Sequence, residues 1–206
     1  MKQQLLFITL LLFTVNLSAQ DAFLSMGRNF TTYDFENSEG LSNDKIEGGS
    51  GAFYEAGVAF DLDNWIKGLS YAPSITLNQY NASGGDLASA YRWETNYLGL
   101  NNTLKLNVLN NSDYIDLSIK MGIGLATIIN GQQSINGLTY DLTENDEFKG
   151  LWIQPHGGFD IIYFAASDIG IGAGYTFTKA FGGKDDGQSL SFNNSQLQFL
   201  IKINLN

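Results

Sequence analysis

The segment Ile-Asp-Leu-Ser-Ile-Lys-Met-Gly-Ile-Gly-Leu, residues 115–125, decides the fold. Every odd-numbered residue in it carries a large apolar side chain, and every even-numbered residue is charged, hydroxyl-bearing or glycine. A two-residue period is that of a β-strand whose two faces meet different surroundings. We therefore expect a strand here with one apolar face and one polar or small face.

The same period recurs along most of the chain, and helix signals are nearly absent. Seven further segments alternate in this way, at residues 22–29, 52–61, 69–78, 98–108, 151–163, 169–177 and 196–205. Eight strands in a row, joined by turn-forming residues, predict an all-β protein with an up-and-down meander.

Composition bounds the possible functions. The 206 residues include 11 Lys and Arg against 21 Asp and Glu, one His and no Cys, for a net charge of −10. The lack of Cys excludes disulfides, thiol nucleophiles and cysteine zinc sites. The acidic balance argues against nucleic acid as a partner, because phosphate contacts need clustered Lys and Arg.

The N-terminal segment predicts export. Lys2 precedes an apolar run over residues 5–15, which is too short to span a bilayer as a helix. Small and polar residues follow up to Ala19. This pattern is typical of a secretory signal peptide over residues 1–19, and it leaves residues 20–206 as one barrel domain.

The connections between the expected strands alternate in length. Long ones are expected at residues 31–50, 82–92, 130–147 and 178–190, and short ones at 61–68, 110–113 and 165–168. Transmembrane barrels have short periplasmic turns and longer outer loops. We therefore expect both termini in the periplasm and four long loops outside the cell.

Three architectures could accommodate such strands. A two-sheet sandwich or a soluble ligand-binding barrel turns its apolar face inward, whereas a membrane barrel turns it toward lipid. Only 16% of the residues are charged, against the usual value of about 25%, and the second face is rich in small residues that suit a narrow lumen. These features favour an eight-stranded antiparallel transmembrane β-barrel. We expect a polar network in its lumen, formed by Glu55, Lys105, Asp116, Lys120, Gln154, His156 and Asp160.

Two parts of the sequence resemble a known family. The run over residues 97–106 with the later segment 122–126, and the glycine-rich strand around residues 170–175, are similar to the small outer-membrane β-barrel domain family of Gram-negative bacteria, the OmpX- and OmpW-like proteins. The resemblance implies an outer-membrane barrel of the porin-family type, with no assigned catalytic residues.

Catalytic chemistry has one candidate. His156 is the only histidine, and it shares its strand face with Gln154 and Asp160. A base oriented by Asp160 could serve a serine nucleophile in a lipid hydrolase or acyltransferase. However, no G-x-S-x-G motif is present, and Asp160 lies about 13 Å further along the strand. We therefore favour a structural role for His156 in the lumen network, with no enzymatic activity.

Neither cofactor nor metal is expected. The acidic residues in segments 141–147 and 185–187 match no calcium-loop spacing, and a solvated loop explains them better. Segment 31–50 is also acidic. The expected partners are outer-membrane lipid and lipopolysaccharide, and an extracellular or envelope protein bound through the loops. We expect a structural or surface-interaction role, with a lipid-directed enzyme using His156, or a narrow channel or binder for a small apolar ligand, as the alternatives.

Overall fold

The computed structural model describes residues 20–36, 46–84, 90–109, 114–135, 137–143, 145, 148–165, 168–185 and 188–205. The signal peptide expected over residues 1–19 lies outside this part of the chain. Within it, no helix is long and apolar enough to cross a membrane. The strands are β1 (Asp21–Glu36), β2 (Ile46–Asp61), β3 (Leu69–Gly84), β4 (Tyr91–Asn107), β5 (Ile115–Ile135), β6 (Leu138–Asp141), β7 (Leu151–Phe164), β8 (Ile169–Asp185) and β9 (Gln188–Asn204).

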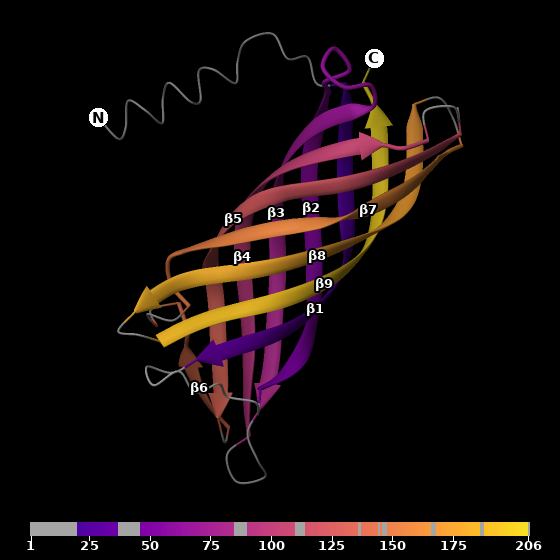
Figure 1. Cartoon of the computed structure of the whole chain (residues 1–206). Coiled ribbons are helices and arrows are strands. Elements are labelled where there is room, and N and C mark those ends of the chain that lie inside the picture. The colour runs from indigo at the N-terminus through magenta and orange to yellow at the C-terminus, as the bar shows by residue number, and fades with distance from the viewer. Residues whose placement is uncertain are drawn as a thin grey trace.

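Eight of these strands close into an antiparallel up-and-down barrel (Figure 1). Each long strand pairs with its neighbours in the chain, and β1 pairs with β9 without interruption from Asp21↔Asn204 to Glu36↔Ser189. The short strand β6 pairs with the end of β5 as a hairpin beside the barrel. The predicted all-β, eight-stranded fold is confirmed.

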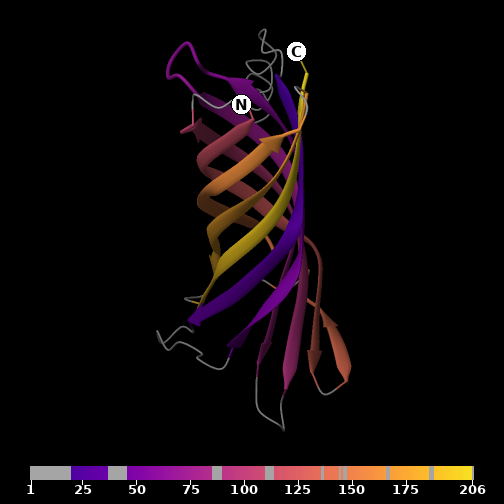
Figure 2. The same ribbon diagram turned by 90° about the vertical axis from the view of Figure 1, so that its right-hand side faces the viewer.

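Both ends of the barrel domain lie on one side of the molecule (Figure 2). An even number of antiparallel strands brings the chain back to the end where it started. The backbone N–H of Leu205 donates to the carbonyl of Gln20 at 2.7 Å, which ties the two ends together. The β5–β6 hairpin projects from the opposite end.

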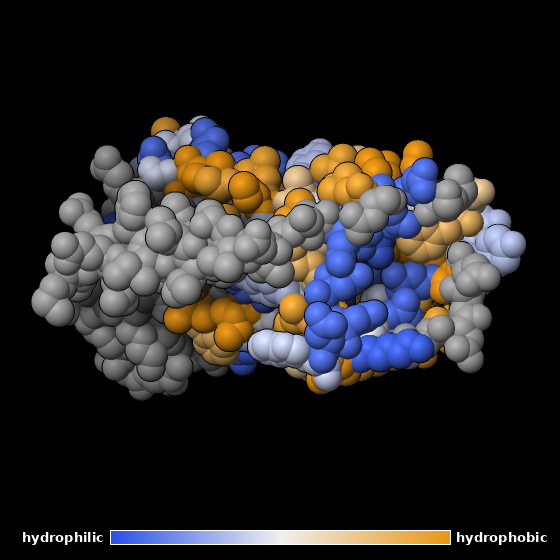
Figure 3. Space-filling model, turned by 90° about the horizontal axis from the view of Figure 1, so that it is seen from above, coloured by the Kyte–Doolittle hydropathy of each residue, from blue (hydrophilic) through white to orange (hydrophobic). Residues whose placement is uncertain are grey.

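The apolar faces of the strands point outward, as predicted. Ile119 is 51% exposed, whereas its neighbours Ser118 and Lys120 are buried. The eleven residues from Ile115 to Leu125 span ten steps, or about 33 Å of strand, which is about 25 Å of membrane at the usual strand tilt. This height matches the apolar band of a transmembrane barrel. Seen from the end that carries the termini, hydrophilic residues gather between hydrophobic margins (Figure 3).

The expected alternation of long and short connections is wrong. Most of the expected outer loops are strand, because β1 continues to Glu36 and β2 already begins at Ile46. Likewise, β8 ends at Asp185 and β9 begins at Gln188, so only residues 186–187 connect them. The ladder joins backbone groups, so it continues through polar residues that have no apolar pattern to reveal them. The strands therefore extend past the apolar belt as a paired rim at the end of the barrel opposite the termini.

Candidate functional site

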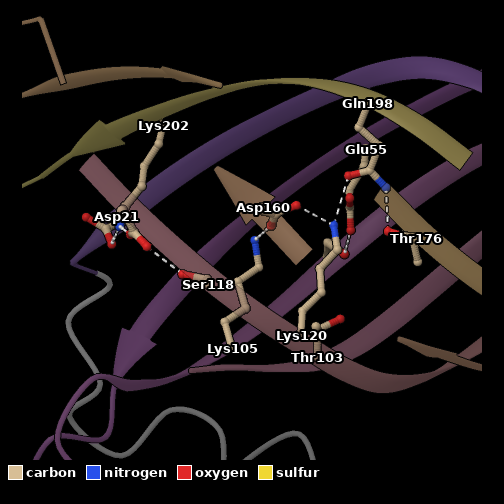
Figure 4. A network of polar contacts seen from close by, with 12 residues as sticks. Asp21, Glu55, Thr103, Lys105, Ser118, Lys120, Asp160, Thr176, Gln198 and Lys202 are labelled. Carbon is tan, nitrogen blue, oxygen red and sulfur yellow. Dashed lines mark hydrogen bonds and ion pairs between the residues drawn. The ribbon is translucent and has the colours of Figure 1, made fainter. Parts of the chain in front are cut away.

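The centre of the lumen holds a cluster of three charged side chains (Figure 4). The Lys105 and Lys120 Nζ atoms lie 3.0 and 2.6 Å from the two oxygens of the Asp160 carboxylate. Lys120 also donates to the Gln198 amide oxygen at 3.0 Å. These residues come from β4, β5, β7 and β9, so the cluster joins opposite walls of the barrel. Buried charges are tolerated when they are paired in this way.

A second ion cluster lies closer to the end that carries the termini. Lys202 Nζ is 2.9 Å from an Asp21 oxygen and 3.5 Å from an Asp116 oxygen. The Ser118 hydroxyl donates to the other oxygen of Asp116 at 2.5 Å. Asp116, one of the expected lumen residues, therefore lies in this cluster and not with Asp160. The cluster connects β1, β5 and β9.

Glu55 faces the same interior from β2. Its carboxylate accepts a hydrogen bond of 2.5 Å from the Ser74 hydroxyl on β3. It lines a central cavity together with Lys105, Lys120 and His156. The cavity has a volume of about 30 Å³, which is room for about two water molecules. This volume is smaller than that of a dissolved nutrient molecule.

His156 is not paired with Asp160. Its Nε2 atom lies 3.0 Å from the Thr103 hydroxyl, and its Nδ1 atom lies 3.2 Å from the Gln154 carbonyl oxygen. The hydroxyl facing the imidazole is therefore that of a threonine, and Nδ1 contacts a backbone carbonyl and not the Asp160 carboxylate. The Gln154 side chain contacts a different residue, accepting from the Tyr80 hydroxyl at 3.4 Å. The geometry brings His156 and Gln154 into the lumen as neighbours without assembling a triad.

Amide side chains form a third layer that the sequence reasoning did not single out. Asn29 Nδ2 donates to the Asn78 oxygen at 3.1 Å, and its own oxygen accepts from Asn194 and Gln196 at 3.0 and 2.8 Å. Thr31 donates to Asn194 at 3.1 Å. These residues join β1, β3 and β9. Strand parity was the available signal, because these residues lie on the face of their strands opposite the apolar one.

The end of the lumen opposite the termini is aromatic, which corrects the expectation of a lumen lined by small and polar residues. The buried rings pack edge-on or tilted, with centroids such as those of Tyr80 and Phe192 only 4.4 Å apart. Phe148 and Leu142, which follow β6, insert into the lumen from this end and are fully buried. The wall residues of this aromatic plug are Tyr33, Tyr80, Trp93, Tyr97, Trp152 and Phe192.

The correction has a physical reason. Inward positions near the polar clusters carry small or hydrogen-bonding groups, whereas Tyr97 and its neighbours fill the end opposite the termini with large rings. Trp152 donates from Nε1 to the Phe148 carbonyl at 3.0 Å, which fixes the inserted segment to the wall. Alternation places Tyr97 on the same strand face as Gly99 and Thr103, but the sequence does not indicate that Tyr97 packs with rings from other strands to form a plug.

Comparison with known proteins locates the fold. No protein-family model and no curated protein sequence matches this chain. Its structure is similar to that of the outer membrane protein OprG from Pseudomonas aeruginosa, with a TM-score of 0.55 and 10% identity over 90% of this chain and 97% of that one. The attachment invasion locus protein Ail of Yersinia pestis gives a TM-score of 0.44, with 11% identity over 90% and 100% of the two chains.

A third similar structure is the outer membrane protease OmpT from Escherichia coli, with a TM-score of 0.45 and 10% identity over 92% of this chain and 98% of that one. Closure of the sheet and an apolar outer belt of bilayer height are the requirements for spanning a membrane with strands. The chain is an integral outer-membrane β-barrel.

Proposed function

We propose that this outer-membrane barrel is a non-conducting, non-catalytic surface protein that anchors a rigid rim outside the cell. The observation that carries the proposal is the filled lumen. Ion clusters, an amide layer and an aromatic plug follow one another along the axis. A diffusive pore needs a continuous water-filled path, and a cavity of about 30 Å³ beneath a plug of buried rings does not supply one.

The rim provides the surface for interaction with partners. Strands that continue past the belt hold their outer ends in a fixed ladder, so a partner meets a pre-organised surface. The β5–β6 hairpin carries Leu138 and Tyr140 at its exposed tip, 62% and 50% accessible. Exposed apolar side chains beyond the lipid belt are suited to contacting an extracellular or envelope protein. Membrane lipid and lipopolysaccharide remain the proposed partners of the belt and its outer edge.

The orientation can be tested with single thiols, because the natural chain has no cysteine. Tyr140→Cys places a thiol on the hairpin, and Trp65→Cys places one in the opposite turn, where the side chain is 83% exposed. A membrane-impermeant maleimide applied to intact cells should label the Tyr140→Cys variant and spare Trp65→Cys. The reverse pattern would place the rim in the periplasm and remove the proposal.

Conductance tests the closed lumen. Purified barrel in planar bilayers should produce no current steps above those of the bare membrane. Regular steps of fixed size would contradict the proposal. The matched variant Trp152→Ala removes one large side chain from the plug. Current through this variant would show that the barrel inserts into the bilayer, so that the absence of current in the parent reflects a closed lumen.

The alternative of a lipid hydrolase or acyltransferase depends on His156. Its neighbours Thr103 and Gln154 supply a hydroxyl and a carbonyl, but the Thr103 hydroxyl is buried in the lumen and lies away from lipid. Asp160 is fully engaged by two lysines and lies too far along the strand to orient the imidazole. We expect His156→Ala to leave the lipid profile of the outer membrane unchanged by mass spectrometry. A lost or accumulated lipid species in that variant, with normal barrel folding, would favour the enzyme.

A further inference from the structure

The aromatic plug has the form of a chamber with rigid walls and an inserted occupant. Its six wall residues, defined above, all lie on barrel strands, from β1, β3, β4, β7 and β9. The Phe148 ring fills the chamber from outside, 5.2 Å from the Trp93 ring and 6.4 Å from the Tyr33 ring. Because the walls belong to the closed sheet, they do not depend on Phe148 for their position.

Among the described residues, two hydrogen-bonding groups on the walls of this chamber have no partner. They are Trp93 Nε1 and the Tyr97 hydroxyl, and their residues are 8% and 0% exposed. A buried donor without an acceptor is unfavourable and rare in native proteins. Other polar groups of the plug are satisfied, such as the Tyr33 hydroxyl, which donates to the Tyr80 carbonyl at 3.1 Å. Trp93 and Tyr97 therefore give the chamber wall two donors that lack an acceptor.

The chamber also has a defined electrostatic character. Its wall residues and the inserted Phe148 and Leu142 are all uncharged. The Lys120 ammonium at the cavity below is already paired with Asp160. A charged ligand would lose its hydration in this chamber and find no opposite charge there, which is unfavourable. An uncharged molecule with an aromatic body fits the rings, and an oxygen acceptor fits the unpaired donors.

We propose that this chamber is a binding site for a small, uncharged aromatic molecule carrying a carbonyl-type acceptor, as in a ketone, ester or amide. Phe148 occupies the site in the state described here, and the ligand takes its place from the outer side. Gly150 joins Phe148 to β7 with a φ of +101°, a conformation that glycine adopts readily. Displacement of Phe148 therefore needs a backbone change at a residue suited to it, and the barrel wall stays intact.

Tryptophan emission provides the assay. The chain has three tryptophans, and two of them, Trp93 and Trp152, form walls of the chamber. In a Trp65→Phe background, emission therefore reports on the chamber alone. The probes are 4′-bromoacetophenone and 1-bromo-4-ethylbenzene, which share size and a quenching bromine but differ in the carbonyl. Both are titrated into the folded barrel in detergent micelles.

We expect saturable quenching by the ketone, with affinity on the order of tenfold higher in Phe148→Ala, because the competing ring is gone. Tyr97→Phe in that background should weaken the ketone about threefold to tenfold and leave the hydrocarbon unchanged. Phe177→Ala removes an equally large ring from the lipid-facing surface, where it is 46% exposed, and should change neither affinity.

Two results would overturn the proposal. One is the absence of saturable quenching in a Phe148→Ala barrel that still shows the heat-dependent gel shift of a folded barrel. The other is equal binding of both probes with no effect of Tyr97→Phe, which would reduce the site to a non-selective apolar gap. If Phe148→Ala does not fold, Phe148→Leu shortens the inserted side chain while keeping it apolar, and the same titrations apply with the same two refuting outcomes.

Discussion

Replacing Asp160 with Asn tests the central charge cluster most directly. The substitution preserves the shape of the side chain and removes the one negative charge that two lysines share, at 3.0 and 2.6 Å. The Asp160 and Lys120 side chains are 1% and 6% exposed, so bulk solvent does not reach the pair. Breaking a buried pair in this way costs about 3–5 kcal/mol of folding free energy. We expect the higher end, because Lys105 and Lys120 then both lose the one carboxylate with which they form ion pairs.

The assay is equilibrium unfolding in urea, with the barrel in detergent micelles and the fraction folded read from the heat-dependent gel shift. The control is Asp116→Asn, where the side chain is 14% exposed, the ion pair is 3.5 Å long and Lys202 keeps Asp21 as a partner. This control should cost about 1 kcal/mol or less.

A second comparison separates charge burial from packing. The triple replacement Lys105→Met, Lys120→Met and Asp160→Leu removes all three charges together, and such exchanges are often close to neutral. It should therefore be more stable than Asp160→Asn alone. If Asp160→Asn unfolds at the same urea concentration as the parent, the cluster contributes nothing to stability and the reasoning fails.

Three further perturbations address the belt, the closure and the hairpin. Ile119→Arg on the lipid-facing side should destabilise the barrel by about 2–4 kcal/mol in urea titrations, whereas Tyr140→Arg on the exposed hairpin should change little; equal effects would contradict the belt. Gly27→Ala puts a methyl group 2.9 Å from a carbonyl carbon of β9, so the gel shift should report loss of about 1–3 kcal/mol at the β1–β9 seam, and an unchanged midpoint would refute this close approach. The backbone N–H and the hydroxyl of Thr143 both donate hydrogen bonds to the Asp141 carboxylate and lower its pKa. These bonds therefore stabilise the turn above the ordinary carboxyl pKa, and the stabilisation is lost as the pH falls through the lowered pKa. Thr143→Val should raise the pKa of Asp141 toward its ordinary value in an NMR titration, and an unchanged pKa would show that the hydroxyl plays no part.

Much of the fold was accessible from alternation alone. The period of residues 115–125 predicts both the strand and the face that meets lipid, because a strand has only two faces and a bilayer accepts only one kind of side chain. The polar extensions of β1 and β8 were not accessible in this way. These extensions are held by hydrogen bonds to the backbone of neighbouring strands. Where neither face of a strand contacts lipid, the side chains need not alternate in polarity, so the sequence pattern does not reveal the strand.

The candidate site divides along the same line. Parity alone predicts that Lys105, Lys120, His156 and Asp160 face the lumen, since each lies on the non-lipid face of its strand. Which of them meet depends on the stagger between strands, a property of the closed barrel and not of any one segment. That stagger brings Asp160 to two lysines and leaves His156 with Thr103.

The sequence by itself determined the number of barrel strands, the orientation of their faces and the membrane as the surrounding solvent. These properties follow from local order, in which each residue differs from its neighbours in polarity. Only the tertiary structure decided the ion pairs, the aromatic chamber and the insertion of Phe148. Those contacts join residues that are far apart in the sequence, such as Asp21 and Lys202, and closure of β1 onto β9 sets their distances.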